Sequence, residues 1–190
     1  MTGWISEIFD RVRQRNLSTP EKTLDSYDRG VAAVAAGKTV QAIKHFTDAI
    51  SAVPDSSKLY HHRADAFALN GQHLKAIGDY DVAVRIDAAY PDTYMDRGNS
   101  RYALGQLGDA VKDFSEAIRL NPDWAEAYAN RAVAHAELEN KTESEQDAAK
   151  AASLGVDQNR LNEMLGPTRS DFDRLPACTG DVVASARRGC

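Results

Sequence analysis

A pattern of residues recurs at a fixed step of 34 positions along most of this chain of 190 residues. Two of the series that show it are Arg29, Arg63, Arg97 and Arg131, and Ala49, Ala83, Ala117 and Ala151. A period of this length is typical of a protein built from stacked units, because one unit alone cannot bury its apolar face. Stacked units present an extended surface, so the repeat favours an interaction protein over an enzyme with a closed pocket.

Each period divides into two helices. In the third period we expect one helix from Pro91 to Leu104 and another from Leu107 to Leu120, with Gly105 as the break between them. When the first period begins at residue 23, the pattern needs no insertion. The four blocks are then residues 23–56, 57–90, 91–124 and 125–158.

The second helix of each of the first three blocks carries apolar residues at i, i+4, i+7 and i+8, which form one stripe. Alanine at a helix crossing lets two helices approach closely, and the aromatic residue fills the space beside them. The stripes are Ala42, Phe46, Ala49 and Ile50; Ala76, Tyr80, Ala83 and Val84; and Ala110, Phe114, Ala117 and Ile118.

These residues resemble the tetratricopeptide repeat (TPR) family over about residues 20–158. The match is clearest in the third block, and the fourth block departs most, at Ser144, Ala148 and Val156. The resemblance implies an all-α fold, a right-handed α-α superhelical solenoid of four helical hairpins with a capping helix at each end. It also implies a non-catalytic module that binds partner proteins. The residues that carry it in the third block are Tyr94, Gly98, Ala110, Phe114, Ala117 and Pro122.

In this family the first helices of successive units line a concave groove. By position, the groove of this chain would be acidic, so the resemblance predicts a protein or peptide ligand that carries Lys or Arg. The alternative is a solvated face on an acidic protein, whose net charge is -5. That charge disfavours nucleic acid as a partner. The expected groove residues are Tyr27, Asp28, Val31, His61, His62, Asp65, Asp92, Asp96, Asn99, Tyr102, Glu126 and Asn130.

One known activity of the family does not fit. TPR proteins that hold the acidic C-terminus of heat-shock chaperones use Lys, Asn and Arg on the concave helices. The corresponding places of the first three blocks carry Tyr27, Val31, His62, Asp92 and Asp96, and those of blocks two to four also lack the cations. We therefore do not expect chaperone-tail binding.

Three of the repeated arginines have an aspartate 16 residues further on. We predict ion pairs of structural importance between the two helices of a hairpin, or between neighbouring hairpins. Arg29 has His45 at that place instead. The three pairs are Arg63 with Asp79, Arg97 with Asp113, and Arg131 with Asp147.

His61, His62 and Asp65 are candidates for a metal cluster, because His61 and Asp65 share one helix face. Adjacent histidines on a helix point in different directions, and no further ligand is evident, so we expect no metal and no cofactor. Nucleophile elbows, phosphate loops and paired acid–base groups are not evident in the sequence either, so we expect no catalytic residue and no enzyme activity.

Residues outside the repeats are expected to form an N-terminal amphipathic helix or cap (1–19), a C-terminal capping helix (159–166) and a flexible tail (167–190). The N-terminal segment is expected to pack on the first repeat. The alternative is a membrane-peripheral adaptor docked through residues 1–17. Self-association through the ends also remains open.

The expected location is cytoplasmic, with the membrane periphery as the alternative, because no apolar run is long enough to span a membrane and no secretory signal is evident. The two cysteines, Cys178 and Cys190, lack the spacing of zinc ligands, and the sequence assigns them no role.

Overall fold

A computed structural model describes residues 18–166 of the chain. All the regular secondary structure in this range is α-helical, which confirms the prediction of an all-α repeat protein. The helices belong to two compact units, which meet in sequence between Pro122 and Asp123.

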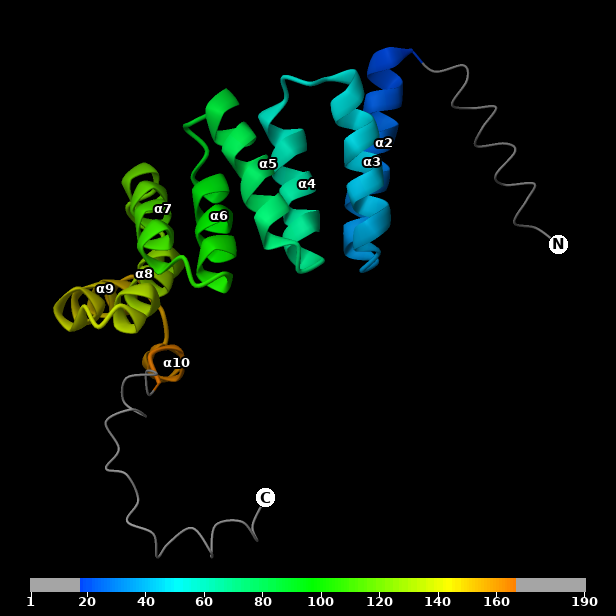
Figure 1. Ribbon diagram of the computed structural model, residues 1–190. Coiled ribbons are helices and arrows are strands. Elements are labelled where there is room, and N and C mark those ends of the chain that lie inside the picture. Colours follow the sequence, from blue (N-terminus) through cyan, green and yellow to red (C-terminus); the bar gives the residue numbers. More distant parts are fainter. Residues whose placement is uncertain (1–17, 167–190) are drawn as a thin grey trace, which may run out of the picture. The chain divides into compact units, whose positions relative to one another are not determined.

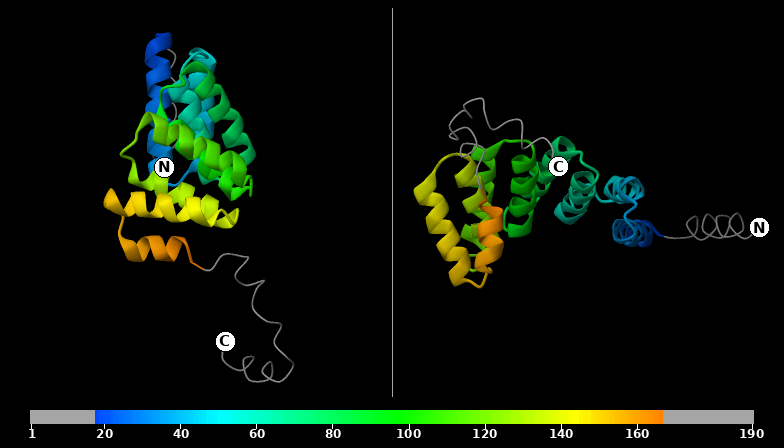
Figure 2. Two further views of the ribbon diagram at one scale, coloured as in Figure 1. Left: turned by 90° about the vertical axis from the view of Figure 1, so that its left-hand side faces the viewer. Right: turned by 90° about the horizontal axis from the view of Figure 1, so that it is seen from below.

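The first unit consists of three helical hairpins (Figure 1). Within each hairpin the two helices pack against each other, and the second helix of one hairpin packs against the first helix of the next. Figure 2 shows the same helices from two further sides. The helices are α2 (Thr19–Ala35), α3 (Thr39–Ala52), α4 (Ser57–Leu69), α5 (His73–Ile86), α6 (Pro91–Ala103) and α7 (Leu107–Leu120).

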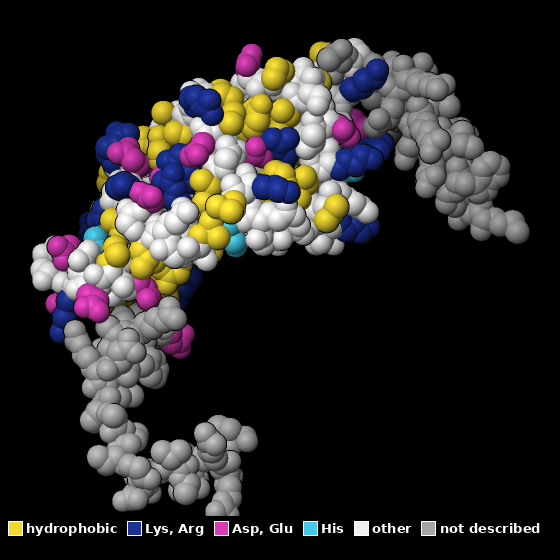
Figure 3. Space-filling view, viewed as in Figure 1, with side chains coloured by type: hydrophobic (Ala, Val, Ile, Leu, Met, Phe, Trp, Pro, Cys, Tyr) yellow, Lys and Arg dark blue, Asp and Glu magenta, His cyan; other side chains and the backbone are white. Residues whose placement is uncertain are grey.

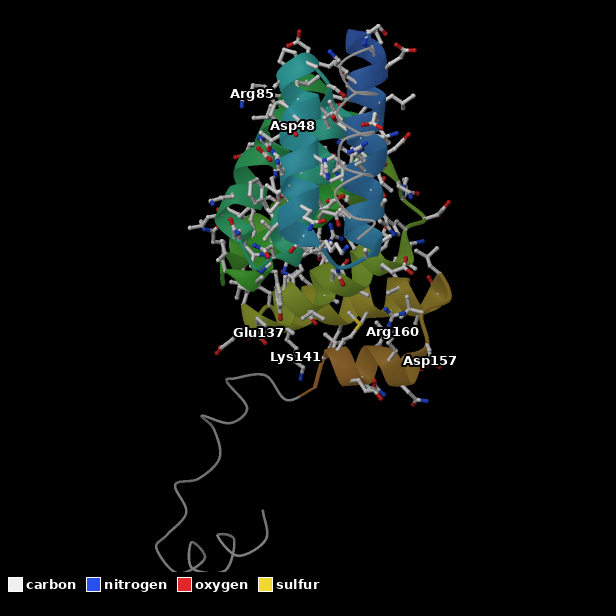
Figure 4. The ribbon with its side chains drawn as sticks, turned by 90° about the vertical axis from the view of Figure 1, so that its right-hand side faces the viewer. Asp48, Arg85, Glu137, Lys141, Asp157 and Arg160 are labelled. Carbon is white, nitrogen blue, oxygen red and sulfur yellow. The ribbon has the colours of Figure 1, made fainter. Side chains whose placement is uncertain are left out.

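The second unit contains one hairpin and a short helix: α8 (Ala125–Glu137), α9 (Lys141–Ser153) and α10 (Gln158–Met164). Leu161 of α10 is buried in a cluster with Ala129 and Ala151, so α10 covers the apolar side of this hairpin. Asp157 is the N-cap residue just before α10, and its Oδ1 accepts hydrogen bonds from two backbone N–H groups of the first turn, one of them that of Arg160 (Figure 4).

The turn inside each hairpin depends on one residue with a positive φ angle. The four positions are themselves 34 residues apart: Gly37, Gly71, Gly105 and Glu139, with φ angles of 69°, 72°, 72° and 60°. Glycine adopts this conformation without a steric penalty from a Cβ atom. Glu139 is the one non-glycine residue among the described residues that has a positive φ.

Buried alanines and aromatic residues form the core of each hairpin in the first unit, as the stripes predict. Ala42, Phe46, Ala76, Tyr80 and Phe114 are each at most 1% exposed. On the surface turned to the viewer in Figure 3, charges of both signs are interspersed with apolar side chains over the first unit.

Close helix contact explains the glycines of the first helices. A Cβ atom placed on Gly30 would lie 2.5 Å from Cε1 of Phe46, and one on Gly98 would lie 2.6 Å from Cε1 of Phe114. These distances are below any normal contact, so only glycine lets the phenylalanine ring lie against the backbone of the first helix.

The predicted ion pairs between the helices of a hairpin are confirmed. The nitrogen–oxygen distances are 2.6 Å for Arg63 with Asp79 and 2.7 Å for Arg131 with Asp147. Arg97 lies 2.6 Å from Asp113. Arg29 differs, because it pairs with Asp25 of its own helix at 2.9 Å.

The arginines of the second and third hairpins also reach back by the same 16 residues. Nη1 of Arg63 donates to Oγ1 of Thr47 at 3.2 Å, and Nη1 of Arg97 donates to Oδ1 of Asp81 at 2.7 Å. Each of these arginines therefore ties the two helices of its own hairpin to the hairpin before it.

Several expectations concern residues outside the described range. They are the amphipathic segment 1–17, the tail 167–190 and the two cysteines. Between residues 18 and 166, no helix combines the length and the apolar character needed to cross a membrane.

Candidate functional site

The candidate site lies in the first unit, on the sides of α2, α4 and α6 that carry Tyr27, His62, Asp65 and Asp96. We call this surface the first-helix face. Helix α4 supplies its centre, because it packs against α3 and α5 and also contacts α6. Side chains from three hairpins therefore meet there.

His62 connects the first hairpin to the second. Its Nε2 lies 3.1 Å from the hydroxyl of Tyr27, and its ring stacks on that of Phe46 with 5.8 Å between ring centroids. Nζ of Lys58 lies 4.7 Å from the centre of the phenol ring of Tyr27. These contacts join Tyr27 of α2 to two side chains of α4.

His61 connects the second hairpin to the third. Its side chain is 8% exposed, and its Nδ1 lies 3.1 Å from Oγ1 of the buried Thr93 on α6. Its Nε2 lies 3.5 Å from Oδ2 of Asp65 and 3.8 Å from Oδ2 of Asp96. One imidazole therefore contacts a hydroxyl through one nitrogen and approaches two carboxylates with the other.

Asp65 is also held by a hydrogen bond from helix α5. Its Oδ1 accepts a hydrogen bond of 2.8 Å from the hydroxyl of Tyr80 on α5. Its Oδ2 lies 3.5 Å from Nδ1 of His62, the same distance as from Nε2 of His61. The carboxylate thus stands between two histidines and a buried tyrosine.

The electrostatic environment of this face disfavours additional negative charge. Partial burial, followed by the charges of Asp65 and Asp92, raises the pKa of Asp96 to about 7, although its side chain remains 38% exposed. Burial also lowers the pKa of His61, partly offset by Asp65, so the imidazole is neutral at neutral pH. A cationic ligand group would relieve the repulsion among the carboxylates.

Three cavities lie along the face. The first, of about 360 Å³, is mainly apolar and is lined by residues that include Leu24, Tyr27 and Leu59. The second has a similar volume and is lined in part by His61, His62 and Tyr90. The third, of about 440 Å³, is lined by Asp65, His73, Asp96, Asn99 and other residues. Lys58 lines both the first and the second cavity.

The geometry differs from the sequence-based expectation for the directions of His61 and His62, while the expectation that no metal binds stays a prediction. Helical periodicity predicts that His61 and His62 point in different directions, which counts against a metal cluster. In the structure, one ligand atom from each of His61, His62 and Asp65 lies within 4.8 Å of the other two. The two rings reach the same place because one histidine faces Asp65 through Nε2 and the other through Nδ1.

Two models of tetratricopeptide repeats match the chain, over residues 27–91 and 98–138. Together they cover more than half of its length. The chain belongs to the tetratricopeptide repeat family. It is therefore a protein-interaction module in the general sense of that family.

Solved TPR structures resemble the chain. MamA is 18% identical, with a TM-score of 0.71, and the match covers 77% of this chain and 84% of MamA, so it shows the fold alone. The first TPR of Spaghetti (RPAP3), bound to the HSP90 peptide SRMEEVD, is 29% identical over 62% of this chain and 94% of that domain, with a TM-score of 0.61. Among curated proteins, no sequence matches the chain.

A third TPR structure is the second domain of human RPAP3 in complex with the HSP70 peptide SGPTIEEVD. It is 26% identical to this chain, with a TM-score of 0.59, over 62% of this chain and 98% of that domain. Both RPAP3 domains are thus TPR units that hold a short peptide with an acidic end.

The remaining predicted residues of this TPR protein are distributed as follows. Asp28 and Val31 are exposed on α2, Asp92 and Tyr102 are partly buried on α6, and Asn99 lines the third cavity. Glu126 and Asn130 belong to α8 in the second unit. The described contacts therefore bring together Tyr27, His61, His62, Asp65 and Asp96.

Sequence reasoning misses Thr93 and the role of Tyr80. The apolar stripe assigns Tyr80 to the core, where it does lie, but its hydroxyl also holds Asp65. The sequence does indicate that Tyr80 differs from its counterparts, since the equivalent residues of the other two hairpins in this unit are Phe46 and Phe114, which carry no hydroxyl. Thr93 gives no comparable signal, because its contact with His61 depends on how α4 and α6 meet.

Proposed function

We propose that this TPR protein is a non-catalytic module that binds a peptide segment carrying Lys or Arg on its first-helix face. The observation that supports this is the convergence of Asp65, Asp92 and Asp96, where partial burial, followed by the charges of the other two carboxylates, raises the pKa of Asp96. A lysine or arginine of a ligand would compensate these charges.

The cavities suggest how such a segment would lie. An apolar side chain fits the first cavity, beside Leu24 and Leu59, and a basic side chain fits the third, beside Asp65 and Asp96. The second cavity is lined by α4, by Thr93 of α6 and by the loop that precedes α6, and it offers Tyr90 and the histidines for contact. An extended segment bound by side-chain pockets is a common mode of peptide recognition.

The related domains provide a contrast. The peptides in the two RPAP3 structures, SRMEEVD and SGPTIEEVD, end in acidic residues. The first-helix face of this chain carries Asp92 and Asp96 on its third hairpin, and such carboxylates would repel an acidic peptide end. We therefore propose the opposite charge preference for this chain.

A selection from a library of random peptides displayed on phage tests the proposal, with the full chain as bait and EDTA present throughout. We expect enriched peptides to carry Lys or Arg together with an apolar residue. In fluorescence anisotropy, their affinity should fall with rising salt concentration, and Asp96→Lys should weaken it by at least about tenfold.

The matched control is Asp48→Lys, which makes the same charge reversal on an exposed residue of α3 (Figure 4). Its affinity should stay close to that of the wild type. Enrichment of acidic peptides, or binding that ignores both salt and Asp96→Lys, would refute the proposed ligand.

A further inference from the structure

Three potential metal ligands on α4 converge on one point. They are Nε2 of His61, Nδ1 of His62 and Oδ2 of Asp65, all within 4.8 Å of one another. Oδ2 is 3.5 Å from each nitrogen. In a tetrahedral site with metal–ligand bonds of about 2.0–2.1 Å, ligand atoms are roughly 3.3–3.4 Å apart. The carboxylate oxygen already lies near this spacing from both imidazoles.

Each of these three side chains is oriented by a hydrogen bond at its other polar atom. Nδ1 of His61 meets the hydroxyl of Thr93, and Nε2 of His62 meets the hydroxyl of Tyr27, each at 3.1 Å. When an imidazole donates its N–H to such a hydroxyl, the opposite nitrogen presents a lone pair.

Asp65 follows the same arrangement. Its Oδ1 accepts from the hydroxyl of Tyr80 at 2.8 Å, which leaves Oδ2 facing the histidines. Outer hydrogen bonds of this kind are a regular feature of metal sites, because they fix the orientation of each ligand. Here they come from α2, α5 and α6, three helices other than the one that carries the ligands.

A fourth potential ligand atom lies close by. Oδ2 of Asp96 on α6 is 3.8 Å from Nε2 of His61. With Asp65 and Asp96, the point of convergence has two carboxylates to balance the charge of a divalent cation. His61 is largely buried, whereas His62 and Asp65 are partly exposed and give an ion access from solvent.

We propose that His61, His62 and Asp65, with Asp96 as a fourth ligand, bind one divalent transition-metal ion on the first-helix face. Two imidazoles favour zinc, cobalt or nickel over magnesium and calcium, which prefer sites composed of oxygen ligands. The metal site shares Asp65 and Asp96 with the proposed peptide surface, but it needs no ligand from a partner, so each proposal can be tested without the other.

Isothermal titration calorimetry tests the site. The full chain is first treated with EDTA and dialysed, and it is then titrated with zinc chloride. We expect one equivalent of zinc to bind. Cobalt(II) bound at the same place should show the visible absorption of a four-coordinate ion without thiolate bands. Calcium chloride, used as the oxygen-preferring probe, should bind at least about 100-fold more weakly than zinc.

Asp65→Asn is the informative variant, because its amide oxygen can still accept from Tyr80 while an NH₂ group replaces the oxygen that faces the histidines. We expect zinc affinity to fall by more than about 100-fold, beyond the usual loss from an outer-shell change. Tyr80→Phe removes only the outer hydrogen bond and should weaken binding by about tenfold.

Two control variants distinguish binding at this site from a general effect of charge and from binding by the cysteines. Asp92→Asn removes the same charge from the same face without removing a proposed ligand and should change affinity by less than about tenfold. Replacing both Cys178 and Cys190 with serine should leave binding unchanged. Circular dichroism of each variant establishes that it is folded.

The proposal fails if the wild type binds no stoichiometric zinc, if folded Asp65→Asn binds zinc as the wild type does, or if the cysteine replacement abolishes binding. None of these results bears on the peptide experiment, which is carried out in EDTA. Conversely, a failed peptide selection leaves the zinc titration unaffected.

Discussion

Arg97 holds the carboxylate of Asp113 through two nitrogens, with Nε 3.0 Å from Oδ2 and Nη2 2.6 Å from Oδ1. The pair is shielded from solvent, since the side chain of Arg97 is 12% exposed and that of Asp113 is 3% exposed. Arg101 donates to the same carboxylate at 2.8 Å. One aspartate of α7 thus orients two arginines of α6.

Removing this carboxylate should destabilise the first unit strongly. Asp113→Ala removes the buried partner of two largely buried guanidinium groups and leaves them only the more exposed Asp81 as a shared partner, so we expect the free energy of unfolding to fall by about 3 kcal/mol. Urea unfolding followed by circular dichroism measures the change. Asp109→Ala, which breaks the exposed pair with Lys112, should cost less than about 1 kcal/mol. Equal effects of the two substitutions would contradict this view of Asp113.

A methyl group at Gly98 should overfill the contact between α6 and α7. The added Cβ would lie 2.6 Å from Cε1 and 2.9 Å from Cδ1 of Phe114, so we expect Gly98→Ala to lower the free energy of unfolding by about 1–3 kcal/mol. Thermal unfolding measures the energetic coupling between the two positions when it is carried out on Gly98→Ala, on Phe114→Leu and on the double variant. The double variant should lose less than the two single losses added together; additive losses would exclude the clash as the cause.

The hairpin turn of the second unit should gain stability from glycine. Glu139 has a φ angle of 60°, in the region that costs an L-residue about 1–2 kcal/mol. Glu139→Gly should therefore raise the free energy of unfolding by about 0.5–1 kcal/mol, once the greater freedom of glycine in the unfolded chain is counted. Glu137→Gly, two residues earlier at the last helical position of α8, should instead be destabilising by less than about 1 kcal/mol. Calorimetric scans compare the two, and a stabilising effect of both would refute the role assigned to φ.

The start of α2 should lose stability on acidification. Glu21 accepts hydrogen bonds from the backbone N–H and the hydroxyl of Ser18, at 2.8 Å and 2.7 Å, and these bonds lower the pKa of Glu21 below its ordinary value of 4.5. As the pH falls, the carboxylate of Glu21 is therefore protonated at a higher pH in the unfolded chain than in the folded one. The stabilisation is complete above the ordinary pKa and is lost as the pH falls through the lowered one.

Melting temperatures of the wild type and Glu21→Gln, measured from neutral to acidic pH, test this expectation. The wild type should be the more stable at neutral pH, and its advantage should shrink as Glu21 becomes protonated. Ser18→Ala removes one of the two donors and should reduce the pH dependence. An advantage that stays constant down to strongly acidic pH would show that Glu21 does not contribute through this hydrogen bonding.

The sequence predicts most of the scaffold because the scaffold depends on local, repeated constraints. Helix α7 spans Leu107–Leu120 as expected, and α6 ends at Ala103, one residue before its expected end. The spacing of small and aromatic residues, the glycine of the turn and the arginine–aspartate step each recur in three of the four blocks, so the blocks support the same interpretation.

The site is less predictable because it depends on what differs between blocks. Whether His62 faces Asp65 through Nδ1 depends on its side-chain rotamer and on the hydroxyl of Tyr27, which comes from another hairpin. Thr93 meets His61 only because α6 contacts α4. Neither relationship follows from helical periodicity, which places residues on a face but does not set the direction of each polar atom.

The hydroxyl of Tyr80 shows how one repeat of a periodic protein can come to differ from the others. Its ring occupies the space that Phe46 and Phe114 occupy in the sister hairpins, and a single added oxygen atom reaches Asp65. Phenylalanine and tyrosine codons differ by one base. A repeat can therefore gain or lose a polar anchor in one mutational step while its framework remains intact, so duplicated units are free to diverge in recognition before they diverge in shape.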